Sequence, residues 1–287
     1  MTDRNNKPLR KPVWLKSKLP DGTDYRVIKE ILDQKGLHTI CQSGHCPNLG
    51  ECWGRGTATL LILGDICTRS CKFCATKTGK PLPVDNTEPV KAANLVKDLH
   101  LTHVVLTSVD RDDLPDGGAA AWVAVIREIR RINPGTTIET LIPDFGGKKE
   151  NIQQVINEQP EIISHNLETV RRLTPLVRSS AQYERSLKVL HQISQEGVVA
   201  KSGIMVGLGE TPEEVFSLMD DLRMAGCQIL TVGQYLQPTL DHFPVSVYIT
   251  PEQFEIYRTA GLKKVFSCVE SGPLIRSSYH AEQQVSC

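Results

Sequence analysis

Residues 59–74 read TLLILGDICTRSCKFC. The run TLLILG is short and apolar, and a glycine ends it, which predicts a buried β-strand. Three cysteines follow with the spacing C-x3-C-x2-C, at Cys67, Cys71 and Cys74. In α/β barrels, the loops at the carboxyl ends of strands build the active site. The stretch therefore predicts the first strand of a parallel sheet with a site at its end.

The triplet offers three thiolates in one tight loop, without a fourth. Structural zinc sites close four ligands, whereas a 4Fe-4S cluster held by three cysteines keeps one iron open for another ligand. Phe73, just before the last cysteine, is placed to shield such a cluster from water. The spacing favours a cluster with an open iron.

Outward from this stretch, strand patterns alternate with helical patterns. The predicted strands are 59–64, 103–109, 136–143, 161–167, 198–208 and 227–236. Each is followed by a helical segment, which implies a parallel sheet with right-handed crossovers. Six units are too few for a full eight-fold barrel. We expect an α/β fold, a partial (β/α)6 barrel of the TIM type with extensions at both ends.

Helix signals support this reading. Between Trp122 and Ile132, apolar residues recur at helical spacing while arginines and a glutamate occupy the other face. The segment TPEE from Thr211 predicts an N-cap, a proline at the first position and a glutamate that bonds back to the cap. The segment TPEQ from Thr250 predicts a second helix start of the same kind.

Composition excludes several function classes. The 287 residues carry 33 Lys plus Arg and 33 Asp plus Glu, so no net field attracts nucleic acid or an anionic membrane. The longest apolar run falls short of the roughly 18 residues that a membrane helix needs. The N-terminal stretch is polar and basic, without the apolar core of a secretory signal. We expect a cytoplasmic protein whose nine cysteines are reduced.

A second triplet lies upstream in CQSGHCPNLGEC, residues 41–52. Its spacing is C-x4-C-x5-C, again three ligands in one glycine-containing loop. Zinc is an alternative, because His45, beside Cys46, would complete a Cys3His site with the first triplet. We expect the other cysteines to be buried or inert thiols. The upstream ligands are Cys41, Cys46 and Cys52, and the remaining thiols are Cys227, Cys268 and Cys287.

Together the two triplets resemble those of the radical S-adenosylmethionine (SAM) superfamily and, within it, the lipoyl synthase family. The resemblance continues in LTSVDRDDLPDGGA (106–119), HNLETVRRLTPLVR (165–178), GIMVGLGE (203–210) and GPLIRSSYHA (272–281). It covers residues 36–281. It implies three segments: an N-terminal extension with the upstream loop (1–57), the radical SAM partial barrel (58–262), and a tail with RSSY that covers the active site (263–287).

The resemblance implies a role for each triplet. The downstream cysteines would hold a 4Fe-4S cluster whose open iron chelates SAM, which is cleaved to a 5'-deoxyadenosyl radical that abstracts hydrogen from an unactivated C-H bond. The upstream cysteines would hold a second, auxiliary 4Fe-4S cluster that is consumed as the sulfur source. Its fourth ligand would be a serine of RSSY, Ser277 or Ser278, and we favour Ser278. An oxygen ligand binds soft iron more weakly than thiolate and can leave.

The resemblance also implies contacts with SAM. Asn166 and Glu168 would bind its ribose and amino group, and Arg178 its carboxylate. Ser108 and Asp110 would lie at the same rim, and glycines of GIMVGLGE would let the backbone approach the adenine. The expected SAM-binding residues are Phe73, Ser108, Asp110, Asn166, Glu168, Arg178 and Gly207, with Gly203 and Gly209 nearby.

The implied reaction is insertion of sulfur at C6 and C8 of an octanoyl-lysine on a carrier protein. The expected carriers are the lipoyl domains of oxo-acid dehydrogenase complexes and the glycine-cleavage H protein. A ferredoxin or flavodoxin would supply electrons to a monomer. Two alternatives stand beside it: a biotin-synthase-like sulfur inserter, and a zinc-binding interaction module with two structural triplets. Electron transfer alone makes little sense of two open-site triplets.

Overall fold

The computed structural model describes residues 9–16, 23–44, 46–54 and 59–285. Within these ranges the main sheet has eight strands in the order β1-β2-β5-β6-β7-β8-β9-β10. Every neighbouring pair is parallel except β1 and β2. The strands are β1 (His38–Thr39), β2 (Thr59–Ile62), β5 (His103–Ser108), β6 (Thr137–Leu141), β7 (Ile162–Ser164), β8 (Val199–Val206), β9 (Ile229–Gln234) and β10 (Cys268–Gly272).

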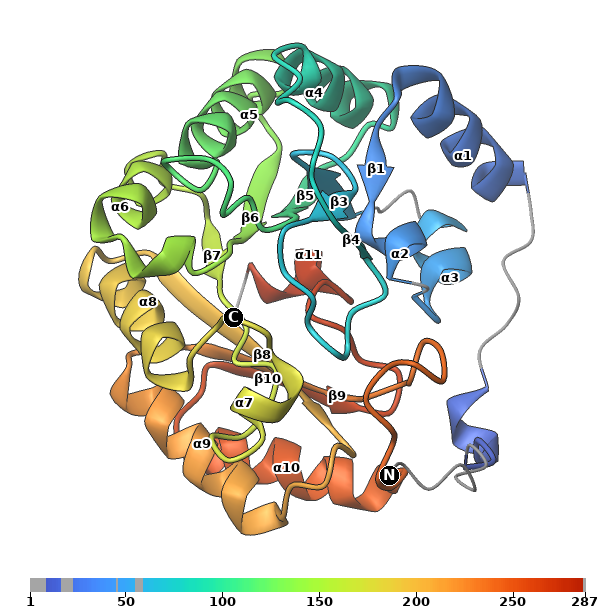
Figure 1. Ribbon diagram of the computed structural model, residues 1–287, viewed down its shortest axis with the longest axis vertical. Helices are drawn as coiled ribbons and strands as arrows, with labels where there is room; N and C mark the ends of the chain where they lie inside the picture. The colour runs from blue at the N-terminus through green and yellow to red at the C-terminus, as the bar shows by residue number, and fades with distance from the viewer. Residues whose placement is uncertain (1–8, 17–22, 45, 55–58, 286–287) are drawn as a thin grey trace.

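The curled sheet lies inside a ring of helices (Figure 1). The ring contains α4 (Glu88–Asp98), α5 (Ala119–Ile132), α6 (Lys149–Asn157), α8 (Tyr183–Gln195), α9 (Pro212–Met224) and α10 (Pro251–Lys263). Because the strand order begins at β1 and ends at β10 in the described ranges, the barrel is open. The α/β partial barrel and its six predicted strands are confirmed.

A further parallel strand, β10, was not expected. It pairs with β9 from Cys268 to Gly272, inside the segment 263–287 that the sequence assigns to the tail. Only Val269 in this strand is a strongly apolar, buried residue, so the segment lacks the periodic pattern that marks the other strands. The tail therefore begins with a strand of the barrel sheet.

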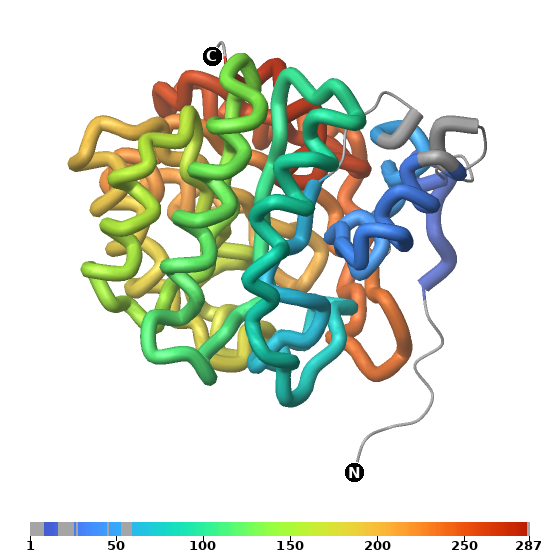
Figure 2. The backbone as a smooth tube through the Cα atoms, turned by 90° about the horizontal axis from the view of Figure 1, so that it is seen from above, coloured from blue at the N-terminus to red at the C-terminus, as the bar shows by residue number. Residues whose placement is uncertain are grey.

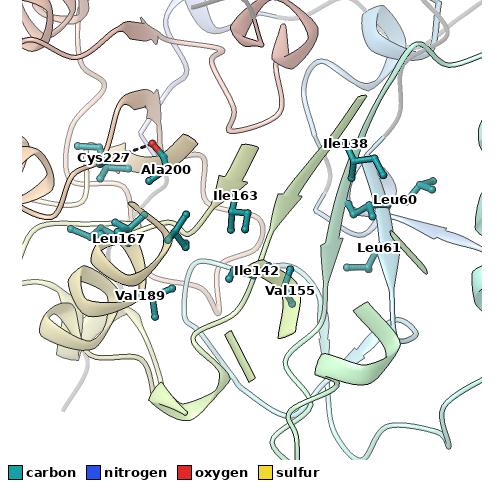
Figure 3. Packing of buried hydrophobic residues seen from close by; sticks show 14 of the residues in the cluster. Leu60, Leu61, Ile138, Ile142, Val155, Ile163, Leu167, Val189, Ala200 and Cys227 are labelled. Atoms are coloured by element: carbon teal, nitrogen blue, oxygen red, sulfur yellow. Dashed lines mark hydrogen bonds between the residues drawn. The ribbon is translucent and has the colours of Figure 1, made fainter. Parts of the chain in front are cut away.

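Helix α5 shows how the sequence directs the packing. Its stripe of Trp122, Val125, Ile126 and Ile129 is buried. Successive side chains of a strand point to opposite faces, so Leu60 packs toward the helices while its neighbour Leu61 faces the barrel interior. Figure 3 shows side chains from strands and helices meeting in this layer.

The two helix caps predicted from TPEE and TPEQ are present. Thr211 Oγ1 accepts a hydrogen bond from the backbone of Glu214, whose carboxylate accepts one from the Thr211 N–H. At α10, Thr250 Oγ1 accepts from the Gln253 N–H. Each cap satisfies N–H groups that a helix leaves unpaired at its start. The caps fix where α9 and α10 begin after β8 and β9.

The smaller elements lie around the barrel's edge and ends. Figure 2 shows the C-terminal segment at the end of the barrel opposite to the loop that follows β2. No helix in the described part of the chain is long and apolar enough to cross a membrane. These elements are η1 (Val13–Leu15), α1 (Thr23–Lys35), α2 (Ile40–Ser43), α3 (Leu49–Gly54), β3 (Ile66–Cys67), β4 (Lys77–Thr78), η2 (Phe145–Gly147), α7 (Thr174–Val177) and α11 (Ala281–Gln284).

Candidate active site

A cavity of about 550 Å³ opens at the carboxyl ends of the parallel strands. The three cysteines of the loop after β2 form part of its wall. Six of the seven predicted SAM contacts line it as well, although they come from different loops. Those residues are Phe73, Ser108, Asp110, Asn166, Glu168 and Arg178. The fold thus brings the downstream triplet and its predicted partners to one place.

The thiols of this loop are suited to a metal cluster. Cys67 Sγ accepts hydrogen bonds from the backbone N–H groups of Arg69, at 3.4 Å, and Asp110, at 3.3 Å. Burial raises the pKa of Cys67 to about 11 and also raises that of Cys74. Such thiols stay protonated at neutral pH unless a cation replaces the proton. The cavity therefore holds ligands that iron would convert to thiolates.

Several buried polar atoms in this cavity have no hydrogen-bond partner among the described residues. They are Ser108 Oγ, Asn166 Oδ1 and Arg178 Nε. An unpaired buried polar group costs roughly 1 to 3 kcal/mol, so these atoms fit a polar ligand that would satisfy them. Glu168 lies beside them in a left-handed backbone conformation, φ +67°. Burial raises the pKa of its carboxyl, opposed by the charge of Arg178.

Arg178 is held in place from behind. Its Nη1 donates to the carbonyl oxygens of Asn166, at 3.1 Å, and Leu167, at 3.4 Å, and to Ser186 Oγ, at 3.1 Å. His165 also contacts Ser186, and burial lowers the pKa of its imidazole to about 4. The imidazole is therefore neutral at pH 7. Arg178 remains the fixed cation on this side of the cavity.

The upstream triplet lines a second, smaller cavity at the amino ends of β2 and β5. Cys41, Cys46 and Cys52 share it with Ser278. Thr59, the first residue of β2, donates a hydrogen bond of 2.8 Å from Oγ1 to Ser278 Oγ. Burial, with a contribution from the neighbouring Cys46, raises the pKa of Cys41 to about 11. The Cys41 thiol, like that of Cys67, therefore needs a cation to ionise at neutral pH.

The RSSY segment lies between the two cavities. Arg276 lines both, Ser277 lines the first, and Ser278 lines the second. Two contacts tie the segment to the upstream cysteine loop. Asn48 Nδ2 donates to the Leu274 carbonyl at 2.7 Å, and Tyr279 Oη donates to Glu51 Oε1 at 3.0 Å. Of the two serines, Ser278 is the one that shares a cavity with the upstream cysteines.

Family models match two parts of the sequence. The model of the radical SAM superfamily matches residues 61–222, more than half of the chain. The model of the N-terminal domain of lipoyl synthase matches residues 1–46.

Curated proteins match over nearly the full length. Lipoyl synthase from Bacteroides fragilis is 62% identical over 281 residues, 98% of this chain and 98% of the relative. Lipoyl synthase from Bacteroides thetaiotaomicron is 60% identical over 285 residues, 99% and 100% of the two chains. This chain belongs to the lipoyl synthase family. It is a radical SAM sulfurtransferase, and the zinc-module alternative is wrong.

Solved structures agree with the fold of this lipoyl synthase family member. Methylornithine synthase matches with a TM-score of 0.54 at 12% identity, over 86% of this chain and 76% of the other. The hydrogenase maturase HydG from Carboxydothermus hydrogenoformans matches with 0.56 at 12%, over 91% and 77%. At such low identity the likeness concerns the partial barrel alone.

One predicted contact, Gly207, does not line the cavity of this lipoyl synthase family member. Its backbone has φ +96°, and a Cβ there would lie 2.2 Å from Gln234 Nε2 and 2.5 Å from the Val247 carbonyl oxygen. Glycine is therefore required at this position, because the backbone at Val247 packs directly against the residue that follows β8. Gly203 does line the cavity, where a Cβ would lie 2.9 Å from Asn166 Oδ1.

Arg69, between the first two cysteines of the downstream loop, was not singled out from the sequence. Its buried guanidinium forms a bidentate pair with Asp112 and also pairs with Asp110, at 3.1 Å, and Asp144, at 2.7 Å. These acids follow β5 and β6, so the pairs pin the cysteine loop to two strand ends. The acidic run DRDD at residues 110–113 is the sequence feature that could have indicated carboxylate partners for Arg69.

The remaining cysteines are placed as far as the structure describes them. Cys227 is fully buried, and its Sγ donates to the Ile229 carbonyl at 3.3 Å. Burial raises its pKa to about 12. Cys268 begins β10. His45, the fourth ligand of the zinc alternative, and Cys287 lie outside the described residues.

Proposed function

We propose that this chain converts an octanoyl-lysine on a lipoyl-domain carrier protein into a lipoyl-lysine. Two sulfur atoms enter, at C6 and then at C8, with one SAM consumed for each. The unactivated C-H bonds have no accessible pKa, so no protein acid or base can break them, and a cofactor must carry this chemistry. The chain's own task is to hold the cofactors and exclude competing reactions.

In the first cavity, Cys67, Cys71 and Cys74 hold one 4Fe-4S cluster. Bound there, the cluster supplies the electron that cleaves SAM. Arg178 binds the SAM carboxylate, since its guanidinium is held at the cavity wall and its Nε lacks a partner among the described residues. The unpaired oxygens of Ser108 and Asn166 accept hydrogen bonds from the amino and ribose groups. Phe73, Asp110 and Glu168 complete the wall.

In the second cavity, Cys41, Cys46, Cys52 and Ser278 hold an auxiliary 4Fe-4S cluster. That cluster supplies the inserted sulfur when bound. A serine oxygen binds soft iron more weakly than a thiolate, so Ser278 would be the most weakly bound ligand of that cluster. Thr59 holds the Ser278 oxygen at the cavity wall through its hydrogen bond.

The octanoyl chain lies in the first cavity against apolar side chains. Leu61, Ile142, Met205 and Ile275 line this cavity beside its polar groups, a mixture typical of ligand sites. Arg276 and Ser277 line it from the side of the second cavity. The substrate carbon is thereby placed between the radical source and the sulfur source.

The same proposal includes the carrier proteins, the electron donor and the oligomeric state of the enzyme. The carriers are lipoyl domains of oxo-acid dehydrogenase complexes and the glycine-cleavage H protein. A ferredoxin or flavodoxin delivers the electrons, and the enzyme acts as a monomer. The segments 1–57 and 58–262 contribute the auxiliary loop and the barrel, and 263–287 contributes the barrel strand β10 followed by the covering tail.

One observation carries the proposal: two cysteine triplets line two cavities of one barrel, and a single segment, RSSY, lines both. The test uses anaerobically reconstituted protein with an octanoyl-lysine carrier peptide, SAM and dithionite. We expect 5'-deoxyadenosine, methionine and a lipoyl peptide by mass spectrometry. Absence of any thiolated product from protein with both clusters loaded would refute it.

A further inference from the structure

Arg178 has one edge of its guanidinium group unpaired in the first cavity. Its Nη1 donates to two backbone carbonyl oxygens and to Ser186 Oγ. Its Nε is buried without a partner, and no described residue accepts a hydrogen bond from Nη2. The acidic residues that line the same cavity are Asp110, Asp144 and Glu168. None of them forms an ion pair with Arg178 in the described ranges.

Two other arginines of this chain show what the same edge binds. Arg69 holds Asp112 through Nε and Nη2, at 2.7 and 2.8 Å. Arg111 holds Asp113 through the same two nitrogens, each at 2.9 Å. Such parallel bonds are the side-on geometry in which a guanidinium binds a carboxylate. The Nε–Nη2 edge of Arg178 therefore fits a carboxylate that a ligand brings.

The direction of this edge depends on a chain of buried hydrogen bonds that ends at Nη1. His165 Nδ1 lies 2.9 Å from the Ile142 carbonyl oxygen, and its Nε2 lies 2.9 Å from Ser186 Oγ. Ser186 Oγ accepts from Arg178 Nη1 at 3.1 Å. His165 is 2% exposed and Ser186 is fully buried. The chain thus connects the end of β6 to the guanidinium through one imidazole and one hydroxyl.

The protons of this chain have one arrangement that satisfies every group. A carbonyl oxygen only accepts, so His165 Nδ1 carries a proton and donates it to Ile142. In the neutral ring Nε2 is then an acceptor, and the Ser186 hydroxyl donates to it while its oxygen accepts from Arg178. A second ring proton would place two cations at one buried hydroxyl. Burial, together with the charge of Arg178, accordingly lowers the pKa of His165 to about 4.

We propose that Ser186 and His165 are positioning residues for the carboxylate of SAM. Through the hydrogen bond to Nη1 they hold the guanidinium so that its Nε–Nη2 edge is directed at the ligand. An arginine already held in its binding orientation loses less rotamer freedom when the ligand arrives, which raises affinity. The inference rests on the proposed function, because it requires SAM in the first cavity with its carboxylate at Arg178.

The test measures SAM binding to the full-length protein with both clusters reconstituted. Equilibrium dialysis with labelled SAM is carried out anaerobically and without a reductant, so that SAM binds but is not cleaved. Arg178→Gln removes the cation and should raise Kd about a hundredfold. Ser186→Ala should raise Kd about tenfold, the effect of one hydrogen bond to a charged group. Ser186→Thr keeps the hydroxyl and should remain within about threefold of the parent.

Two comparisons separate positioning from packing. In the Arg178→Gln background, Ser186→Ala should change Kd by less than about twofold, because the group on which Ser186 acts is gone. Ser164→Ala is the matched control: it removes another buried serine hydroxyl, which donates to Glu139 at 2.8 Å and has no hydrogen bond to Arg178 among the described residues. This control should also leave Kd within about twofold of the parent.

His165→Asn tests the next link of the chain. The shorter amide keeps a donor near the Ile142 carbonyl but does not reach Ser186. Its effect on Kd should match that of Ser186→Ala. The double variant should bind SAM no more weakly than either single variant, because both changes break the same chain. His165→Asn decides the question by itself if Ser186→Ala does not fold.

The outcomes distinguish the inference from the proposed function. Unchanged SAM binding in Ser186→Ala, while Arg178→Gln binds more weakly, would overturn the inference alone. Equal weakening by Ser164→Ala, or by Ser186→Ala in the Arg178→Gln background, would show a loss of packing and would overturn it as well. If Arg178→Gln binds SAM as the parent does, or if the reconstituted parent binds no SAM, the proposed function fails at this site and the inference with it.

Discussion

The two cavities differ in how far apart their residues lie in the sequence. The cysteines of the first come from one short stretch, 67–74, in a loop that follows one strand. The second combines the loop 41–52 with the starts of β2 and β5 and with the tail. Its Thr59–Ser278 contact joins residues 219 positions apart. The three cysteines proposed for the first cluster are therefore neighbours in the sequence, whereas the second site is assembled only when β2, β5 and the tail have folded together.

The largest effect should come from breaking the local site. We expect Cys71→Ala to abolish SAM cleavage, because the first cluster loses one of its three thiolates. The second cavity lies at the other end of the barrel and should keep its cluster. Iron should fall from about eight to about four per chain, with no 5'-deoxyadenosine by chromatography. Loss of all iron would show that the two sites are not independent.

A change in the second site should preserve SAM cleavage and reduce the lipoyl product. Ser278→Cys should keep both clusters and SAM cleavage but lose most lipoyl product, because a thiolate holds the iron more firmly than the serine oxygen. The measurement is the ratio of lipoyl peptide to 5'-deoxyadenosine. Full product formation would argue against serine lability.

The anchor of the downstream loop should give an intermediate effect. Asp144→Asn removes one carboxylate from the buried Arg69, whose side chain is 5% exposed. We expect a loss of about 3 kcal/mol in the free energy of unfolding, since one partner of a buried ion pair is removed.

The control for Asp144→Asn is Glu158→Gln. It breaks a surface pair with Arg127, whose side chain is 70% exposed, and should lower the free energy of unfolding far less than Asp144→Asn does. Anaerobic denaturant unfolding compares the two variants. Equal losses would mean that the Arg69 pairs are no more than surface pairs.

The smallest effect is predicted outside both cavities. Thr211→Ala removes the cap of α9, which should cost about 1 kcal/mol of stability. Iron content and SAM cleavage should not change, because no residue of the capping box lines either cavity. Thermal unfolding together with iron analysis checks both parts. A drop in iron would show that cluster retention follows global stability, and would weaken the comparison between the sites.

The sequence predicts what is local and periodic. The strand before Cys67, the stripe of α5 and the cap at Thr211 follow from residues within one element. The strand β10 is missed because its run contains polar residues and gains its place only by pairing with β9. Periodicity carries no information on such pairing.

The same distinction holds for the candidate site. The cysteine spacings are visible in the sequence, whereas the role of Ser278 as a ligand is inferred only from the resemblance to the lipoyl synthase family. The contact between Thr59 and Ser278 depends on folding, which brings the start of β2 beside a tail far along the chain. Arg69 is visible as a residue between two cysteines, yet its three carboxylate partners are brought together only by folding.

The Thr59–Ser278 contact sets an order on biosynthesis. The ribosome makes Cys41, Cys46 and Cys52 early, but Ser278 only after the last barrel strand, β10. While the chain is growing, these three thiols therefore face the surroundings without the wall that later encloses them. The complete ligand set proposed for the auxiliary cluster is available only once translation has passed β10, whereas the three cysteines proposed for the first cluster are complete once Cys74 has been added.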